Sequence, residues 1–179
     1  GNEDIKKAIH KQVDDHLHLM VYGEYIISPQ VDLVQLLTEN LPSSLQCVYL
    51  TNSGTEATEG AMKLAKRFTG RTGFISFRNA YHGSTQGALS ICGNEQLKSA
   101  FRPLLPDHRI IEFNSTDQLK YIDSNTAAVF IEPIQAEAGI ILPEKGFLEK
   151  LRQRCNEQNT LLVFDEIQTG MGRTGSLFA

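Results

Sequence analysis

The sequence lacks the features that mark membrane, secreted and nucleic-acid-binding proteins. No run of 18 apolar residues occurs, so a membrane span is not expected. The first residues are polar and charged, without the apolar core of a signal peptide. The net charge of −4 and the pI of about 5.7 argue against a general nucleic-acid surface.

Cysteine is also scarce. The three cysteines (Cys47, Cys92, Cys155) are odd in number and widely spaced, and no CxxC pair occurs. This usage predicts buried thiols in a reducing compartment, rather than a disulfide framework or a zinc site. We therefore expect a cytoplasmic protein with no metal site.

The remaining composition is that of an ordinary soluble globular protein, with 41% apolar and 21% charged residues. A length of 179 residues suits one domain or part of a larger one. Residues 170–179 form a glycine-rich loop with no element after it, and domains rarely end in this way. We therefore expect the chain to be a fragment.

Residues 1–45 are expected to form a helical N-terminal segment. An apolar stripe repeats at every fourth position along residues 4–18 (Ile5, Ile9, Val13, Leu17). This spacing predicts an amphipathic helix. Ser28 and Pro29 predict the N-cap and first position of a second helix, which should end at Pro42.

From residue 46 onward the pattern predicts strands and helices in alternation. Strands are expected over residues 47–51, 73–77, 109–113, 127–131 and 161–164. Helices are expected over residues 55–67 (ended by Gly70), after Ser115 or Thr116, and over residues 146–159. Near-continuous apolar strands of this kind are typical of a parallel sheet with helices on both faces. The sequence thus predicts a three-layer αβα domain of the α/β class with a mainly parallel sheet.

A short turn at residues 52–57 joins an expected strand to an expected helix. It places Ser53, Gly54 and Thr55 at the start of the helix. Backbone N–H groups and hydroxyls at such a position favour an anion such as phosphate. The alternative is an ordinary capped helix in which Gly54 supplies the turn. The segment contains neither GxGxxG nor the Gly-Lys-Ser/Thr of a Walker loop.

Acidic residues follow two of the expected strands. Glu132 comes directly after residues 127–131, with Glu137 close behind, and Asp165 comes directly after residues 161–164. The carboxyl ends of parallel strands line the ligand crevice of an open sheet, where a buried acid needs a cationic partner. Paired carboxylates can indicate glycoside hydrolysis, but nothing else here resembles a sugar cleft. Acids that face a phosphate turn point instead to a cationic ring ligand.

Tyr81 and His82 follow the expected strand at residues 73–77 and a polar turn. The tyrosine could stack on a flat heteroaromatic ligand, and the histidine could form a hydrogen bond with it. Taken alone, the pair favours a buried tyrosine and a surface histidine.

Five blocks in register resemble the class III aminotransferases of the ornithine/acetylornithine type, fold-type I enzymes that use pyridoxal 5'-phosphate. The blocks are Asn-Ser-Gly-Thr-Glu-Ala at 52–57, Tyr-His-Gly at 81–83, Glu-Pro-Ile-Gln at 132–135, Asp-Glu-Ile-Gln-Thr-Gly at 165–170 and Gly-Arg-Thr-Gly at 172–175. The resemblance covers nearly the whole chain and implies that residues 46–179 form a partial cofactor-binding large domain. It also implies amino-group transfer from an amino acid or amine to a 2-oxo acid such as 2-oxoglutarate, by a homodimer.

The resemblance assigns cofactor roles to several residues. Asp165 resembles the acid that pairs with the pyridinium nitrogen and keeps the ring an electron sink. Gln168 resembles the residue near the phenolic oxygen, and Tyr81 the aromatic residue that stacks on the ring. Residues 53–55 match the phosphate-binding turn, and His82 matches a neighbouring histidine.

Two further acids and a missing lysine complete the comparison. Glu132 matches an acid behind the cofactor, and Glu137 resembles the acid that switches between two amino-group substrates by pairing with an arginine. The Schiff-base lysine of the family follows the Asp-Glu-x-Gln block, and no lysine present (Lys63, Lys66 and Lys145 among them) lies in that context. We expect it beyond Ala179, so this chain alone should be inactive. An aminomutase, racemase or decarboxylase of the same fold, or a non-catalytic binding module, are the alternatives.

Overall fold

A computed structural model describes residues 1–179, the whole of the sequence. The chain divides into two compact units, Gly1–Tyr49 and Leu50–Ala179. None of its helices combines the length and the apolar character needed to cross a bilayer.

The first unit contains two helices, α1 (Glu3–His16) and α2 (Ser28–Glu39). The Asn2 side chain caps α1 by accepting hydrogen bonds from two backbone N–H groups of the first turn, at 2.9 and 3.1 Å. The prediction that Ser28 is an N-cap was wrong by one residue. Ile27 occupies that position without a side-chain hydrogen bond, and Ser28 is already helical.

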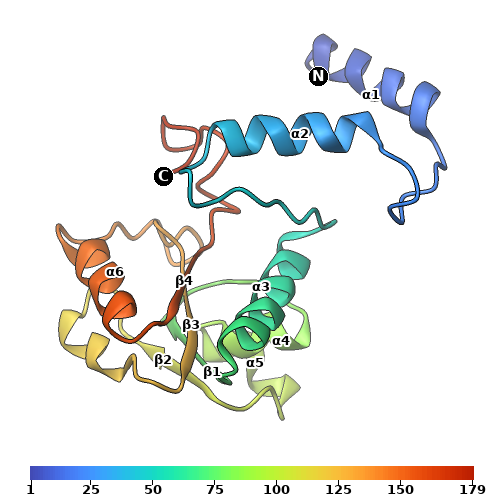
Figure 1. The fold of residues 1–179 in the computed structure, drawn as a ribbon. Helices are drawn as coiled ribbons and strands as arrows, with labels where there is room; N and C mark the ends of the chain where they lie inside the picture. Colours follow the sequence, from blue (N-terminus) through green and yellow to red (C-terminus); the bar gives the residue numbers. More distant parts are fainter. The chain divides into compact units, whose positions relative to one another are not determined.

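The second unit is built around a parallel sheet of four strands in the order β2-β1-β3-β4 (Figure 1). The strands are β1 (Gly73–Phe77), β2 (His108–Ile111), β3 (Thr126–Ile131) and β4 (Leu161–Phe164). All three pairings are parallel, and Val129 of β3 is in register with Ile75 of β1 and Leu162 of β4. The predicted parallel α/β sheet is therefore confirmed.

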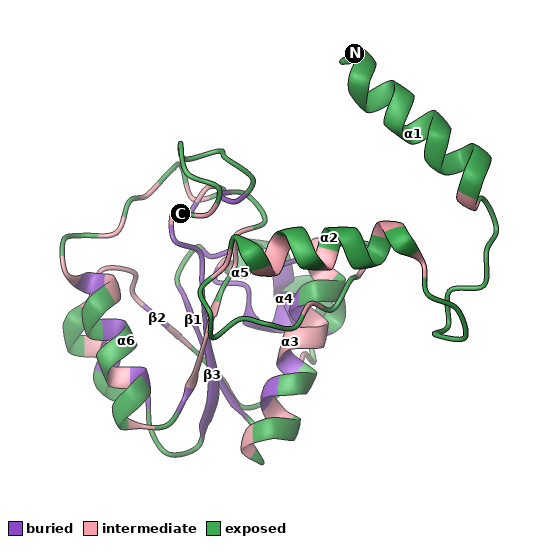
Figure 2. Ribbon diagram, turned by 45° about the horizontal axis from the view of Figure 1, so that its top comes forward, coloured by how far each residue is buried: buried purple, intermediate pink, exposed green.

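Helices cover both faces of this sheet (Figure 1). They are α3 (Gly54–Thr69), α4 (Gln86–Ile91), α5 (Glu95–Lys98) and α6 (Phe147–Glu157), with short 3-10 helices η1 (Ser99–Phe101) and η2 (Thr116–Tyr121). Met62 of α3 and Ile91 of α4 pack on one face against Phe130, and Leu151 of α6 packs on the other against Phe77. The two central strands, β1 and β3, are buried along their whole length (Figure 2).

Three further expectations were wrong. Residues 47–51 are not a strand, because no neighbouring strand pairs with them, and Tyr49 is 83% exposed. Cys47 lies in this exposed stretch, whereas Cys92 and Cys155 are buried as expected. The strand 161–164 is only half-buried, because β4 lies at the edge of the sheet. The short helices α4, α5 and η1 had not been predicted.

Candidate active site

A cavity of about 270 Å³ lies where the loops after β1, β3 and β4 meet the start of α3. It is lined by Gly54, Thr55, Tyr81, His82, Gly83, Ser84, Glu132, Glu137, Asp165, Ile167 and Gln168. Eight of the nine site residues expected from the sequence are in this lining. The ninth, Ser53, is next to it and caps α3 by accepting a hydrogen bond from the Glu56 N–H at 3.3 Å.

Asp165 is the best-anchored acid of the cavity. Its backbone N–H donates to the Ile131 carbonyl at 2.8 Å, so the end of β3 fixes the position of its Cα. Oδ1 accepts the Ile167 N–H at 3.1 Å, and Oδ2 lies 2.8 Å from His82 Nδ1. The carboxyl group is 7% exposed and the imidazole is fully buried. Since the second ring nitrogen, Nε2, has no partner in the chain, Asp165 is the only polar group that orients the ring.

Tyr81 and His82 reverse the burial that their pattern alone favours. Both residues line the cavity, but Tyr81 is 39% exposed, whereas His82 is only 1% exposed. The physical reason is the polar partner available to each residue. His82 meets the carboxylate of Asp165 inside the fold, and the Tyr81 backbone N–H donates to Glu132 Oε2 at 3.2 Å.

Glu132 is a buried acid, 4% exposed, directly after β3. Burial raises the pKa of Glu132 above its usual value, and this effect outweighs the opposing influence of His82 and of the Tyr81 N–H. The folded protein therefore takes up a proton at this carboxyl group at a higher pH than the unfolded chain does. Above the folded-state pKa the charged form destabilises the fold, and this penalty disappears as the pH falls through that pKa.

We expect Glu132→Gln to stabilise the cofactor-free full-length protein against heat at pH 7–8, because the amide keeps an acceptor for Tyr81 without a buried charge. The midpoint should rise by a few degrees, and the gain should shrink as the pH is lowered towards 4.5. Thermal unfolding at a series of pH values measures this, with Glu149→Gln on the exposed face of α6 as the control for losing one acid. A gain that grows at low pH would contradict the assignment.

The first turn of α3 contributes Gly54 and Thr55 to the wall of the cavity. The N–H groups of this turn have no intrahelical partner, and Ser53 takes only that of Glu56, so those of Gly54 and Thr55 remain available for an anion. Gly54 packs closely against the Asp165 block, because a Cβ added to it would lie 2.5 Å from Ile167 Cδ1.

Hydrogen bonds tie this turn to the start of α4. Thr55 Oγ1 lies 2.7 Å from Thr85 Oγ1 and accepts the Thr85 N–H at 3.3 Å. Glu59 accepts from the Thr85 hydroxyl at 2.6 Å and from the N–H groups of Gly87 and Ala88 at 2.8 and 3.0 Å. The carboxylate of Glu59 therefore occupies the N-terminus of α4, which leaves the N-terminus of α3 as the helix end open to a ligand.

Gln168 and Glu137 lie at the exposed rim of the cavity. Glu137 is held in a tight turn, closed by two backbone hydrogen bonds of 3.0 Å between Gln135 and Ile141. Sequence reasoning missed three residues of the lining (Gly83, Ser84, Ile167). Gly83 and Ile167 are direct neighbours of expected site residues in the same sequence blocks, and Ser84 directly follows the block at 81–83, which is the signal that could have found them.

The geometry suits a flat, phosphate-bearing cation. An acid at a strand end, an exposed aromatic ring and a helix N-terminus surround one cavity, and no lysine is among its lining residues. The sequence profile described as "Aminotransferase class-III" matches residues 1–179. The chain belongs to the class-III aminotransferases. The family resemblance is thereby confirmed, and enzymes of this class use pyridoxal phosphate.

Similar proteins support membership of the class-III aminotransferases. An acetylornithine aminotransferase from Methanopyrus kandleri is 43% identical over 176 residues, which are 98% of this chain and 45% of that protein. A [LysW]-aminoadipate semialdehyde/glutamate semialdehyde transaminase from Sulfolobus acidocaldarius is 43% identical over 148 residues, 83% of this chain and 38% of that protein. The chain thus spans less than half the length of these curated relatives.

Solved structures of transaminases share the fold of this class-III chain. An adenosylmethionine-8-amino-7-oxononanoate aminotransferase from Methanocaldococcus jannaschii matches with a TM-score of 0.87 at 31% identity, over 99% of this chain and 44% of that one. A transaminase from a marine Virgibacillus matches with a TM-score of 0.92 at 25% identity, over 99% and 44% of the two chains. The partial fold-type I architecture expected from the sequence is confirmed.

Proposed function

We propose that this chain provides the ring-binding and phosphate-binding part of an aminotransferase that moves an amino group from an amino acid or amine, of the ornithine or acetylornithine kind, to a 2-oxo acid such as 2-oxoglutarate. The observation that carries the proposal is the convergence of Asp165, Tyr81 and the first turn of α3 on one cavity. When bound, pyridoxal 5'-phosphate would supply the electron sink that amino-group transfer needs.

Asp165 holds the proton on the ring nitrogen in this proposal. Its carboxylate is nearly buried and is oriented by His82 and by the Ile167 N–H, so it meets a cation with little loss of conformational entropy. Tyr81 supports the face of the ring, and Gln168 at the rim is available to the phenolic oxygen.

The first turn of α3 binds the phosphate through the N–H groups of Gly54 and Thr55, with Ser53 as the helix cap. Glu132 holds Tyr81 in place by accepting a hydrogen bond from the Tyr81 backbone N–H. Glu137 lies at the exposed rim, where its carboxylate can attract the cationic amino group of a donor.

Two components of the active enzyme are assigned outside this chain. An amine must be held against the cofactor aldehyde, and no lysine lines the cavity, so the Schiff-base lysine is proposed to follow Ala179 in the full-length protein. A homodimer is proposed as the working form, as the resemblance implies.

The test uses the full-length protein with pyridoxal 5'-phosphate, 2-oxoglutarate and either ornithine or N-acetylornithine. We expect a visible absorption band of bound cofactor and the formation of glutamate. Glutamate separates transamination from isomerisation, racemisation or decarboxylation, which do not aminate the 2-oxo acid. A folded protein that shows no cofactor band would refute the cofactor assignment, and a band without glutamate would refute the reaction.

A further inference from the structure

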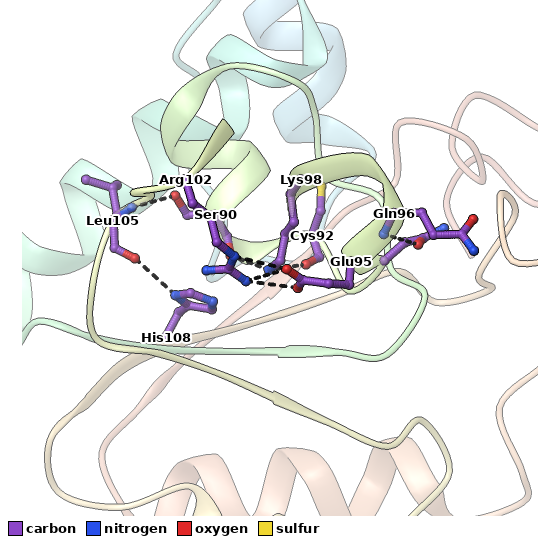
Figure 3. Close-up of polar contacts among 9 residues, drawn as sticks. Ser90, Cys92, Glu95, Gln96, Lys98, Arg102, Leu105 and His108 are labelled. Atoms are coloured by element: carbon purple, nitrogen blue, oxygen red, sulfur yellow. Dashed lines mark hydrogen bonds and ion pairs between the residues drawn. The ribbon is translucent and has the colours of Figure 1, made fainter. Parts of the chain in front are cut away.

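Lys98 is a buried cation that none of the proposed catalytic steps uses. It is the last residue of α5, and no part of it is exposed to solvent. Its Nζ donates hydrogen bonds to the backbone carbonyls of Ser90 at 3.0 Å and of Cys92 at 2.8 Å (Figure 3). Both carbonyls belong to the C-terminal end of α4, so Lys98 caps this helix.

No carboxylate neutralises this charge directly. The nearest acid along the chain, Glu95, is engaged by Arg102, whose Nη2 lies 2.7 and 2.9 Å from its two carboxylate oxygens (Figure 3). Burial accordingly lowers the pKa of Lys98. Lys98 therefore interacts with the carbonyl dipoles at the end of α4 rather than with a counter-ion, and these two hydrogen bonds fix the backbone at Ser90 and Cys92.

Cys92 connects the capped helix end to the active-site loop. Its Sγ accepts the backbone N–H of His82 and donates to the backbone carbonyl of Gly83, both at 3.3 Å. Burial raises the pKa of the thiol, which therefore keeps the proton that it donates. The Cys92 side chain thus holds both the backbone N–H of His82 and the backbone carbonyl of Gly83.

The same loop carries the imidazole that meets Asp165. His82 Nδ1 lies 2.8 Å from Asp165 Oδ2, and Nε2 has no hydrogen-bond partner, so the backbone at His82 and this one polar contact determine which way the ring nitrogens point, while Phe130 packs against the ring at 6.0 Å between centroids. A shift of the backbone at His82 would therefore move the group that orients the carboxylate. The connection runs from Lys98 through Cys92 and His82 to Asp165.

We propose that Lys98 is a positioning residue of the active site, which holds Cys92 in place so that its thiol fixes the His82–Gly83 backbone and thereby orients Asp165. The inference rests on the proposed function, because its consequence is pyridoxal phosphate binding. Its geometric part concerns the protein without any cofactor.

The chain offers a matched control for a purely structural role. Arg71 caps the C-terminal end of α6 by donating from Nη1 to the carbonyls of Gln158 and Asn159, at 2.9 and 3.2 Å. It is likewise a cation on helix-end carbonyls, but none of its hydrogen bonds reaches the active-site loop. Loss of either cap should lower stability, and only loss of Lys98 should disturb His82.

The experiment compares Lys98→Met, Cys92→Ala, Cys92→Ser and Arg71→Met in the full-length protein. Backbone amide hydrogen exchange at His82 is measured without cofactor, and the dissociation constant of pyridoxal 5'-phosphate is measured separately. We expect Lys98→Met and Cys92→Ala each to accelerate exchange at His82 and weaken cofactor binding by roughly tenfold, the effect of losing one buried hydrogen bond. The serine variant keeps a donor and acceptor and should stay near the wild type.

The double variant Lys98→Met/Cys92→Ala should be little worse than either single variant, because both act through one connection. Arg71→Met should lower the melting temperature with unchanged exchange at His82. Unchanged exchange in Lys98→Met, or full additivity with Cys92→Ala, would overturn the proposal. If Lys98→Met does not fold, amide exchange at His82 is compared between Cys92→Ala and Cys92→Ser. Equal exchange rates in these two variants would overturn the proposal. If the wild-type protein binds no cofactor, the proposed function is refuted. Amide exchange at His82, which is measured without cofactor, still tests the positioning role of Lys98.

Discussion

Replacement of Asp165 by alanine is expected to reduce transamination by the full-length protein by roughly 10²–10⁴-fold. Removing one partner of a buried charge pair costs about 3–5 kcal/mol, and each 1.4 kcal/mol or so of barrier is a factor of ten in rate. Asp165 is 7% exposed at its side chain and is oriented by His82 and by the Ile167 N–H, so no water or neighbouring acid can take over its role without rearrangement. Steady-state rates with an amino donor and 2-oxoglutarate measure the loss.

Two further variants define the cause of this loss. Asp165→Asn keeps an acceptor for the Ile167 N–H but carries no charge, so it should lose nearly as much activity as the alanine variant. Asp123→Ala removes an acid that accepts from the Asn125 N–H and the Thr126 hydroxyl at the opposite end of β3, at 3.0 and 3.1 Å. It should lower stability and leave the rate per folded molecule unchanged. Near-normal turnover in Asp165→Ala would refute the proposed role.

The sequence predicted the central part of this fold because the central strands are determined locally. The strand at 73–77 was predicted with the bounds that the structure has, and the helix from residue 55 begins next to its Ser53 cap and ends at Gly70. Strands buried on both faces need continuous apolar runs, and such runs can be read directly from the chain. The edge position of β4 depends on strand order, which no local pattern contains.

The site residues that directly follow strands could be predicted, because the carboxyl ends of parallel strands lie at one edge of the sheet. Glu132 and Asp165 follow β3 and β4, which are neighbours in a parallel sheet, so their meeting at one edge follows from the fold class. The burial of His82 did not follow, because it depends on a carboxylate 83 residues away in the sequence. Lys98 and Cys92 were missed for a similar reason. Their hydrogen-bond partners are backbone carbonyl and N–H groups. Every residue type carries a backbone carbonyl, and every residue but proline an N–H, so the sequence does not indicate these partners.

The second large effect is expected at Gly83, which lines the cavity next to Thr55 of α3. It has a φ of +127°, and a Cβ at this position would overlap the side chain of Thr55 in the first turn of α3. Gly83→Ala must therefore strain the backbone, displace the turn, or do both. Strain of this kind costs about 1–3 kcal/mol, and displacement of the turn moves the N–H groups proposed to bind phosphate.

The full-length Gly83→Ala protein should be destabilised in chemical denaturation and should bind pyridoxal 5'-phosphate at least roughly tenfold more weakly, a loss of about 1.4 kcal/mol. Its affinity for pyridoxal, which lacks the phosphate, should change much less. Gly70→Ala is the matched control, since Gly70 caps the other end of α3 with a φ of +68° and has no atom within 4 Å of an added Cβ. The control should lose stability from backbone strain alone and keep its preference for the phosphorylated ligand. An equal loss of affinity for both ligands in Gly83→Ala would place the phosphate elsewhere than at the first turn of α3.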